Sequence, residues 1–235
     1  DLATTLFRRL GRPNVMIKVP GTLEGVDAVE ELVRRGVNVN ITLLFSVPRY
    51  EAVAEAYLRG LERRAGRLDH GSASVASFFL SRIDAKVDPT LPEGSPARGE
   101  LAIACAKLAH EQFLHRFSGA RWRALVARGA RPQRLLWAST MPKDAGARPT
   151  KYVDALLAPE TVCTMPAKLV AAVHELGVVA RRPITADLGE ARALATRADY
   201  EDIAAELVDE GLAKFQASWD ALVAALAPRL VRRAG

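Results

Sequence analysis

Two short apolar segments near the start of the chain carry polar side chains at alternate positions. Residues 14–19 read Asn-Val-Met-Ile-Lys-Val, and residues 37–42 read Val-Asn-Val-Asn-Ile-Thr. Successive side chains of a β-strand point to opposite faces, so Lys18 lies opposite the branched apolar residues of the first segment. Asn40 and Thr42 lie opposite those of the second. If the two segments are neighbouring parallel strands, Lys18, Asn40 and Thr42 converge on one face near the carboxyl ends of the strands.

A lysine in that position has a specific chemical use. Burial disfavours the charged ammonium and lowers its pKa, and the neutral amine can attack a carbonyl carbon. The iminium that forms is an electron sink for cleavage of a carbon–carbon bond. The alternative for Lys18 is that it extends toward water from the end of a strand or pairs with a carboxylate. The neighbouring asparagine and threonine favour the first interpretation.

The elements that must position these residues alternate along the chain, because short apolar runs are separated by longer segments with helical periodicity. That alternation is typical of α/β proteins with a parallel sheet. We expect five strands and a long amphipathic C-terminal helix marked by Tyr200, Ile203, Leu207, Phe215, Trp219 and Leu222. The predicted strands cover residues 14–19, 37–44, 74–80, 134–138 and 161–165. A closed (β/α)₈ barrel takes eight strands in roughly 250 residues, so three units are missing from that count.

Six blocks of sequence resemble the transaldolase family, in its bacterial form related to transaldolase–glucose-6-phosphate isomerase fusions. The first three include Asn-Val-Met-Ile-Lys-Val-Pro-Gly-Thr, Asn-Val-Asn-Ile-Thr-Leu-Leu-Phe-Ser and Ser-Val-Ala-Ser-Phe-Phe-Leu-Ser-Arg-Ile-Asp. Together the blocks cover residues 14–22, 38–46, 74–84, 130–140, 161–166 and 207–215. The resemblance extends over essentially the whole chain, and the order of the blocks makes it more specific than any one of them.

The resemblance implies a TIM (β/α)₈ barrel of which this chain holds about strands four to eight and a helical C-terminal segment. Lys18 would be the Schiff-base lysine on the fourth barrel strand. Asn40 would hydrogen-bond the sugar intermediate, and Thr42 would help to hold the catalytic water. No cofactor and no metal are implied.

The resemblance also implies residues that bind the substrate phosphate. Ser77 and Arg82 match such positions, and the planar guanidinium of arginine can bond two phosphate oxygens at once. Strict alternation puts these two on opposite faces, so we expect the strand to end near Leu80. Ser139 closes the next strand, and Lys143 is the candidate basic contact in the loop that follows it.

The implied reaction moves a dihydroxyacetone unit between sugar phosphates in the non-oxidative pentose phosphate pathway, in the cytoplasm. The family's proton-transfer aspartate and glutamate would precede Lys18 by more sequence than this chain contains. We therefore expect residues 1–235 to be a single partial domain of a larger protein, poorly soluble or inactive alone. A Schiff-base aldolase of the same fold and a non-catalytic barrel remnant remain alternatives.

A metal-dependent aldolase is less well supported. The four histidines are His70, His110, His115 and His174, and two of them lie five residues apart on one predicted helix, a poor spacing for shared ligands. Cys105 and Cys163 lack a CxxC arrangement. We expect both to be buried thiols in a reducing compartment.

The net charge of +6 could attract nucleic acid or phosphorylated substrates. Aromatic residues make up 6% of the chain, and they fall at helix-core spacing rather than along a basic stripe. We therefore expect Tyr57, Phe117, Phe215 and Trp219 to lie in the core, and no nucleic-acid partner. Apolar runs such as residues 221–227 are far shorter than a membrane span. The oligomeric state stays open.

Overall fold

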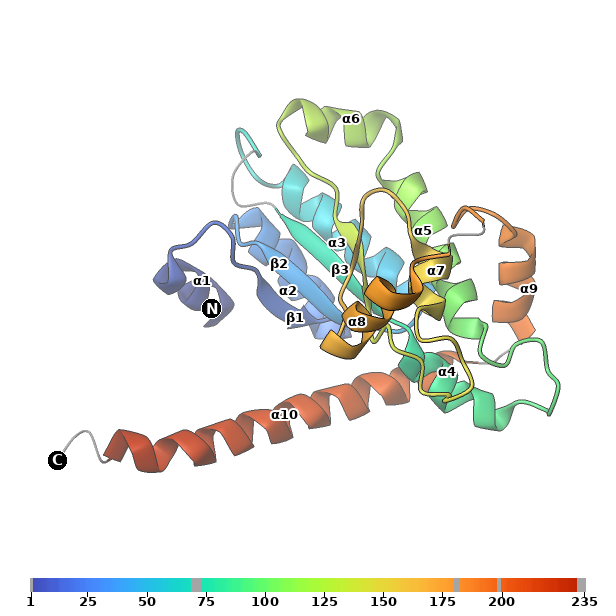
Figure 1. Cartoon of the computed structure of the whole chain (residues 1–235). Coiled ribbons are helices and arrows are strands. Elements are labelled where there is room, and N and C mark those ends of the chain that lie inside the picture. Colours follow the sequence, from blue (N-terminus) through green and yellow to red (C-terminus); the bar gives the residue numbers. More distant parts are fainter. Residues whose placement is uncertain (1, 69–72, 180–181, 198–199, 232–235) are drawn as a thin grey trace.

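The computed structural model describes residues 2–68, 73–179, 182–197 and 200–231, and a five-stranded parallel sheet lies at its centre (Figure 1). The spatial order of the strands equals their order in the sequence, so each pair of neighbours is joined by a crossover connection. The α/β class and all five predicted strands are confirmed, with some strands shorter than expected. The strands are β1 (Ile17–Pro20), β2 (Val39–Leu44), β3 (Ser74–Phe79), β4 (Arg134–Ala138) and β5 (Thr161–Cys163).

Within the described residues the sheet is open. β1 pairs only with β2, and β5 pairs only with β4. The coarse prediction of a parallel α/β sheet is therefore confirmed, while closure of a barrel is not seen in this part of the chain.

Helices join the strands, and local sequence sets where two of them begin. The hydroxyl of Thr22 accepts a hydrogen bond from the backbone of α2, and Ser46 does the same for α3, where Pro48 stands in the first turn. A short helix at 81–87 follows β3 and is not among the predicted elements. The helices are α1 (Leu2–Leu10), α2 (Leu23–Arg34), α3 (Val47–Glu62), α4 (Ser81–Val87), the 3₁₀ turn η1 (Asp88–Thr90), α5 (Leu101–Arg116), α6 (Gly119–Ala127), α7 (Lys151–Leu156), α8 (Ala167–Leu176), α9 (Leu188–Arg197) and α10 (Glu201–Val231).

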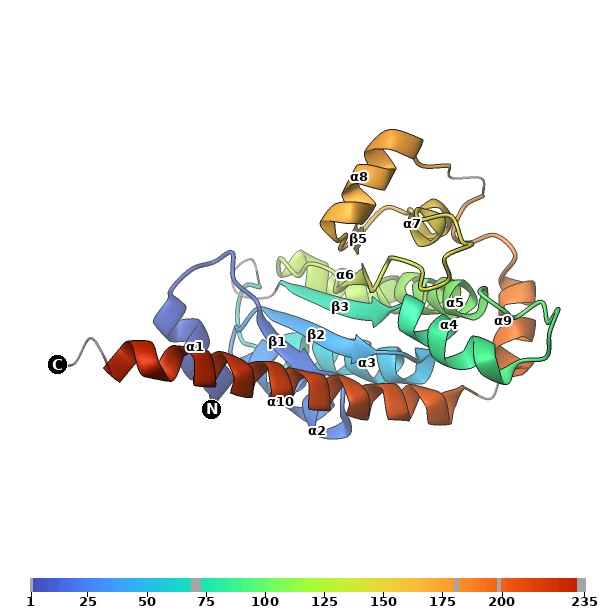
Figure 2. The ribbon, with the colours of Figure 1, turned by 60° about the horizontal axis from the view of Figure 1, so that its bottom comes forward.

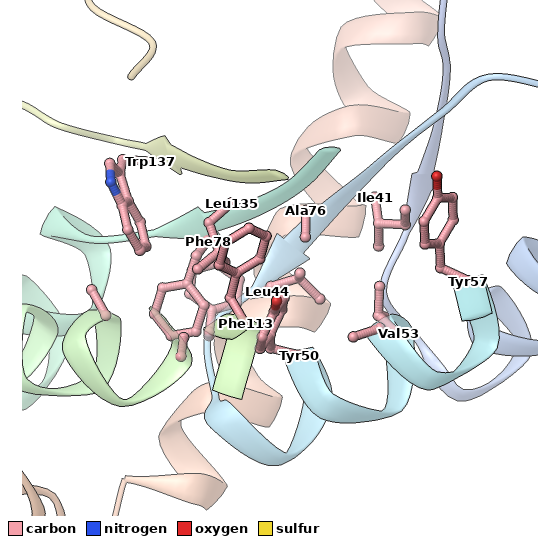
Figure 3. Close-up of a cluster of buried hydrophobic side chains, with 14 of the residues drawn as sticks. Ile41, Leu44, Tyr50, Val53, Tyr57, Ala76, Phe78, Phe113, Leu135 and Trp137 are labelled. Atoms are coloured by element: carbon pink, nitrogen blue, oxygen red, sulfur yellow. The ribbon is translucent and has the colours of Figure 1, made fainter. Parts of the chain in front are cut away.

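One face of the sheet, called here the outer face, packs against α2, α3 and α5 and forms the main core. Alternate strand residues point into it, among them Ile41, Phe78 and Trp137, and they meet Tyr50 and other helix side chains (Figure 3). The rings of Phe78 and Trp137 meet edge to face with their centroids 6.4 Å apart. The period-2 pattern in the sequence thus reports which side chains face the helices.

The opposite face, called here the inner face, carries the other half of each alternation. A smaller apolar cluster fills it beside β3, β4 and β5, with Val75, Leu136 and Ala138 buried and Phe79 partly buried. Beside β1 and β2 the inner face is polar, because Lys18 of β1 and Asn40 of β2 point there. The change from apolar to polar across one face marks where a polar ligand could lie.

The C-terminal helix departs from expectation. Tyr200 and Leu207 are buried, as predicted, but Phe215 is 46% exposed and Trp219 is 61% exposed, so their assignment to the core is wrong. Figures 1 and 2 show the reason, because the second half of α10 extends past the sheet and leaves the body of the molecule. Helical spacing identified an apolar side of α10 without showing what lies against it. Of the two thiols, Cys105 is buried and Cys163 is half-buried.

Candidate active site

The polar part of the inner face brings three predicted residues together on adjacent strands. Lys18 of β1 and Asn40 of β2 are register partners, so their side chains leave the sheet side by side. The hydroxyl of Ser77 in β3 donates a hydrogen bond of 2.7 Å to Oδ1 of Asn40. With its oxygen held in this way, Asn40 presents its amide N–H groups as donors toward the inner face.

Asn38, two residues before Asn40, has a structural role instead. Its amide nitrogen donates to the carbonyls of Pro13 and Val15 at 3.0 and 3.1 Å, and its Oδ1 accepts from the backbone of Ala73 at 3.0 Å. The side chain is buried and links the segments that lead into β1 and β3 to β2. Asn38 therefore helps to fix the positions of the strands that carry the site.

Thr42 lies next along the same face. Its side chain is only 1% exposed, and its hydroxyl has no hydrogen-bond partner in the structure. Directly after it, Leu43 has a φ of 60° and the pairing of β2 with β3 shifts register. Left-handed backbone at a β-branched or bulky residue is strained, and such strain clusters at functional sites. A buried hydroxyl without a partner suits a place where water or a ligand group completes the bonding.

The end of β3 places Arg82 on the same side as Ser77. The strand ends at Phe79 and α4 begins at Ser81, which confirms the expectation that the strand ends near Leu80. The turn carries the guanidinium of Arg82 back over the ring of Phe79, 5.4 Å from its centroid. Phe79 belongs to the inner face, so Arg82 lies on the side that Ser77 faces, while the hydroxyl proton of Ser77 is already donated to Asn40.

Ser139 adjoins the start of α4. It has a φ of 56°, and its hydroxyl lies 2.9 Å from the hydroxyl of Ser81. The backbone of Ser81 also donates to the carbonyl of Ser139 at 3.0 Å, so the ends of β3 and β4 are tied together beside Arg82. Lys143 lies apart from this arrangement, exposed in the loop after β4, and among the described residues no hydrogen bond or ion pair joins it to the site.

The environment of Lys18 is intermediate between the two expectations for it. Partial burial lowers the pKa of its amine below the ordinary value, which is the predicted direction. The side chain is nevertheless exposed, because no described strand lies beyond β1 to cover it. No described carboxylate forms an ion pair with it, so the alternative of a structural salt bridge has no support in this part of the chain. The ring of Phe215 in α10 lies 5.9 Å from its Nζ.

Three residues near the site were not identified from the sequence. Phe79 could have been, because it shares the alternation of Ser77. Ser81 depends on a turn geometry that no local pattern announced, and Phe215 is brought in from a helix almost 200 positions away. Local periodicity does not encode such a contact.

A separate cavity of about 600 Å³ lies between α5 and α7, away from the predicted residues. Its walls include four basic side chains, and all four already have partners. Arg148 binds Asp154 and Arg182 binds Asp187, while Lys151 binds Glu100 and Lys107 donates to the carbonyl of Ala186. The presence of cations therefore does not by itself distinguish this cavity as an anion site.

The described histidines lie outside the candidate site. Burial lowers the pKa of His110, which lies in α5 beneath the outer face, and His70 falls outside the described residues. Across the described ranges, no three side chains of histidine, cysteine, aspartate or glutamate gather as metal ligands would. None of the helices described here is long and apolar enough to cross a membrane.

Comparison with known proteins agrees with this geometry. A model of the transaldolase/fructose-6-phosphate aldolase family matches residues 1–226. The chain belongs to this family. Members similar to it include the transaldolase of Acidothermus cellulolyticus, 44% identical over 98% of this chain, and that of Frankia alni, 40% identical over 98%. The transaldolase of Thiobacillus denitrificans is 43% identical over 95%.

Against these family members the chain is short. It spans 65% of the length of the Acidothermus and Frankia proteins and 66% of the Thiobacillus protein. Family membership therefore rests on nearly all of this chain, which spans about two thirds of the length of these relatives.

Proposed function

We propose that this chain carries the Schiff-base half of a transaldolase, with Lys18 as the covalent catalyst. The observation that carries the proposal is the row Lys18, Asn40 and Ser77 on the polar part of the inner face, joined by strand register and a 2.7 Å hydrogen bond. The five strands would correspond to strands four to eight of a (β/α)₈ barrel. Their uniform parallel order and polar inner face support that assignment.

The chemistry follows from the amine. Neutral Lys18 attacks the C2 carbonyl of sedoheptulose 7-phosphate, and water leaves as the iminium forms. A base then takes the proton of the C4 hydroxyl, the C3–C4 bond breaks, and its electron pair moves to the iminium nitrogen. Erythrose 4-phosphate departs and a dihydroxyacetone enamine stays bound to the lysine. The enamine adds to glyceraldehyde 3-phosphate, and hydrolysis releases fructose 6-phosphate.

Each remaining residue of the site has a proposed part. Asn40 donates to a hydroxyl of the bound sugar, since its oxygen is already occupied by Ser77. The unpartnered hydroxyl of Thr42 binds the water that enters at hydrolysis. Arg82 and Ser139 bind the terminal phosphate, and Lys143 joins them only if its loop turns inward. We assign no carboxylate of this chain to the proton transfers.

Borohydride trapping tests the covalent step. Incubation with fructose 6-phosphate and borohydride, followed by peptide mapping, is expected to place the label on Lys18 in the wild-type chain. Lys18→Arg keeps the positive charge but cannot form the imine, so it should take no label. Label on another lysine, or an equal yield in the variant, would show that the assignment of Lys18 is wrong.

The aldolase alternative shares the lysine and differs in its product. Without an acceptor aldose, an aldolase releases free dihydroxyacetone on every turnover, whereas a transaldolase holds the enamine until an acceptor arrives. We expect a longer protein containing this chain to release little dihydroxyacetone until glyceraldehyde 3-phosphate is added. A non-catalytic remnant would form no imine at all. We further propose that the protein acts in the cytoplasm, where sugar phosphates are found.

A further inference from the structure

The helix α10 passes over the candidate site. Lys86 of α4 forms ion pairs with Glu206 at 3.1 Å and Glu210 at 2.7 Å, and so fixes the first half of α10 beside α4. Both views show α10 running from α4 past the edge of the sheet at β1 (Figures 1 and 2). The helix is thus held in place before it reaches Lys18.

Gly211 sets the distance between α10 and the sheet. A Cβ atom at this position would lie 2.6 Å from Cδ2 of Leu43, closer than real Cβ atoms come to any neighbour. Leu43 is the strained residue that follows Thr42, so α10 rests directly on the carboxyl end of β2. Residues four apart in a helix share a face, and Phe215 is therefore directed to the next strand, β1.

There the aromatic ring meets the amine of Lys18. The distance of 5.9 Å from Nζ to the ring centroid is at the outer limit for a cation–π interaction. At that separation the direct attraction is weak, and the pKa of Lys18 is lowered, the direction that burial produces and that a cation–π attraction would oppose. Among the described residues no carboxylate competes for the amine.

We propose that Phe215 is a positioning residue that holds the amine of Lys18 over the inner face, beside Asn40, and shields one side of it from water. The inference rests on the proposed function, because only a catalytic lysine benefits from being kept in this place and neutral. α10 then serves as one wall of the site, and its contact with Leu43 sets how closely that wall approaches.

The first test measures the amine without substrate. Lys18 acetylation by acetic anhydride is followed by peptide mass spectrometry as a function of pH, in the wild-type chain, Phe215→Ala and Trp219→Ala. Removing the Phe215 ring admits water and relieves the desolvation that lowers the pKa of Lys18, so the pH midpoint for Lys18 should rise and its acetylation near pH 7.5 should slow by about two- to fivefold. Trp219→Ala removes a larger ring one turn further along, which makes no cation–π contact with Lys18 in the described part of the chain, and should leave the midpoint unchanged.

A second variant at Phe215 distinguishes loss of shielding from a general loss of packing. Phe215→Leu keeps an apolar side chain with good helix propensity, so its midpoint should fall between those of the wild type and Phe215→Ala. Circular dichroism is used to check that each variant keeps its helix content. Wild-type midpoints in both Phe215 variants, or an equal shift in Trp219→Ala, would overturn the proposal.

The outcome is separable from that of the proposed function. Imine trapping with fructose 6-phosphate is run on the same proteins. A shifted midpoint with no imine in the wild type would leave Phe215 as a shield and refute Lys18 as catalyst. An imine on Lys18 with identical midpoints in all variants would support Lys18 as catalyst and refute Phe215 as a shield.

Discussion

Two buried threonines near the ends of the strands differ in one respect. Thr42 and Thr140 are each 1% exposed, but only Thr140 has a partner, donating a 2.6 Å hydrogen bond to the carbonyl of Thr164. The hydroxyl of Thr42 is unpaired. A buried hydroxyl without a bond costs free energy, and a bonded one contributes about 1 kcal/mol. The same chemical group should thus oppose folding at one position and support it at the other.

Thr42→Val and Thr140→Val form a matched pair for this comparison. Both replace the hydroxyl by a methyl group of similar size. We expect Thr42→Val to keep or slightly raise the free energy of unfolding in urea, and Thr140→Val to lower it by about 1–2 kcal/mol. In a longer, active protein Thr42→Val should still lose turnover, because hydrolysis of the imine needs the water. Equal losses of stability in the two variants would mean that the hydroxyl of Thr42 has a hydrogen-bond partner in solution.

At the scale of single residues, the sequence predicted which face of a strand each side chain occupies, but not which other groups cover that side chain. Alternation along β1 and β2 predicted that Lys18, Asn40 and Thr42 share a face, as they do. The same pattern could not predict that Lys18 is exposed, since exposure depends on what covers the edge of the sheet. The contact with Phe215 depends on the path of α10, which helical spacing does not specify.

At the scale of the secondary-structure elements, the helices α2 and α3 approach each other closely at Gly60. A Cβ atom at Gly60 would lie 2.7 Å from the carbonyl oxygen of Glu30 and 2.8 Å from Cβ of Val33. Glycine in a helix costs up to about 1 kcal/mol relative to alanine, so its presence in α3 needs a reason. The reason is that the backbones of α2 and α3 approach each other closely there, which leaves no room for a side chain.

The substitution Gly60→Ala therefore improves helix propensity but worsens the packing between α2 and α3. The gain of about 1 kcal/mol in propensity is smaller than the usual cost of about 1–3 kcal/mol for overpacking against backbone atoms. We expect a net loss of about 1–2 kcal/mol in the free energy of unfolding. Gly189→Ala, near the start of α9 with no atom within 4 Å of the added carbon, should instead be neutral or stabilising. Stabilisation by Gly60→Ala would show that α2 and α3 can move apart freely.

A buried carboxylate links three other elements. Asp84 of α4 accepts a 2.8 Å bond from the backbone of Ala102 in α5 and a 2.7 Å bond from the hydroxyl of Tyr152 in α7. Burial raises the pKa of Asp84, while these two donors oppose that shift. Asp84 is thus one of the contacts that hold the short helix after β3, which carries Arg82, to α5 and α7.

Tyr152→Phe removes one of those donors. We expect it to lower the free energy of unfolding by about 1–2 kcal/mol and to raise the pKa of Asp84 further. Tyr50→Phe is the control, because Tyr50 is fully buried in the same layer and its hydroxyl has no partner. That variant should be close to neutral. If both tyrosines proved equally costly, the hydrogen bond to Asp84 would not be the source of the stability.

For the whole molecule, the limit of sequence reasoning lies in what covers each apolar surface. Five strands, their order and their two faces were predictable because local periodicity encodes them. The second half of α10 shows the same periodicity but extends past the sheet. Phe215 and Trp219 were misplaced in the core because helical spacing does not show how much of each ring is covered. The exposed apolar side chains of α1, Leu2, Leu6 and Leu10, show the same effect. Amphipathicity predicts that a face is apolar, and only the three-dimensional structure shows whether it is covered.

The exposed apolar side of α10 gives a test at this scale. Trp219 is 61% exposed and Leu222 is 50% exposed, so the double variant Trp219→Gln, Leu222→Gln removes little buried area. We expect the free energy of unfolding to stay within about 0.5 kcal/mol of wild type, while binding of a hydrophobic dye decreases. Leu207→Ala, at a buried position of the same helix, should cost about 2–4 kcal/mol. A loss of that size in the double variant would mean that this side of α10 is covered in solution, and its dependence on protein concentration would tell whether a second copy covers it.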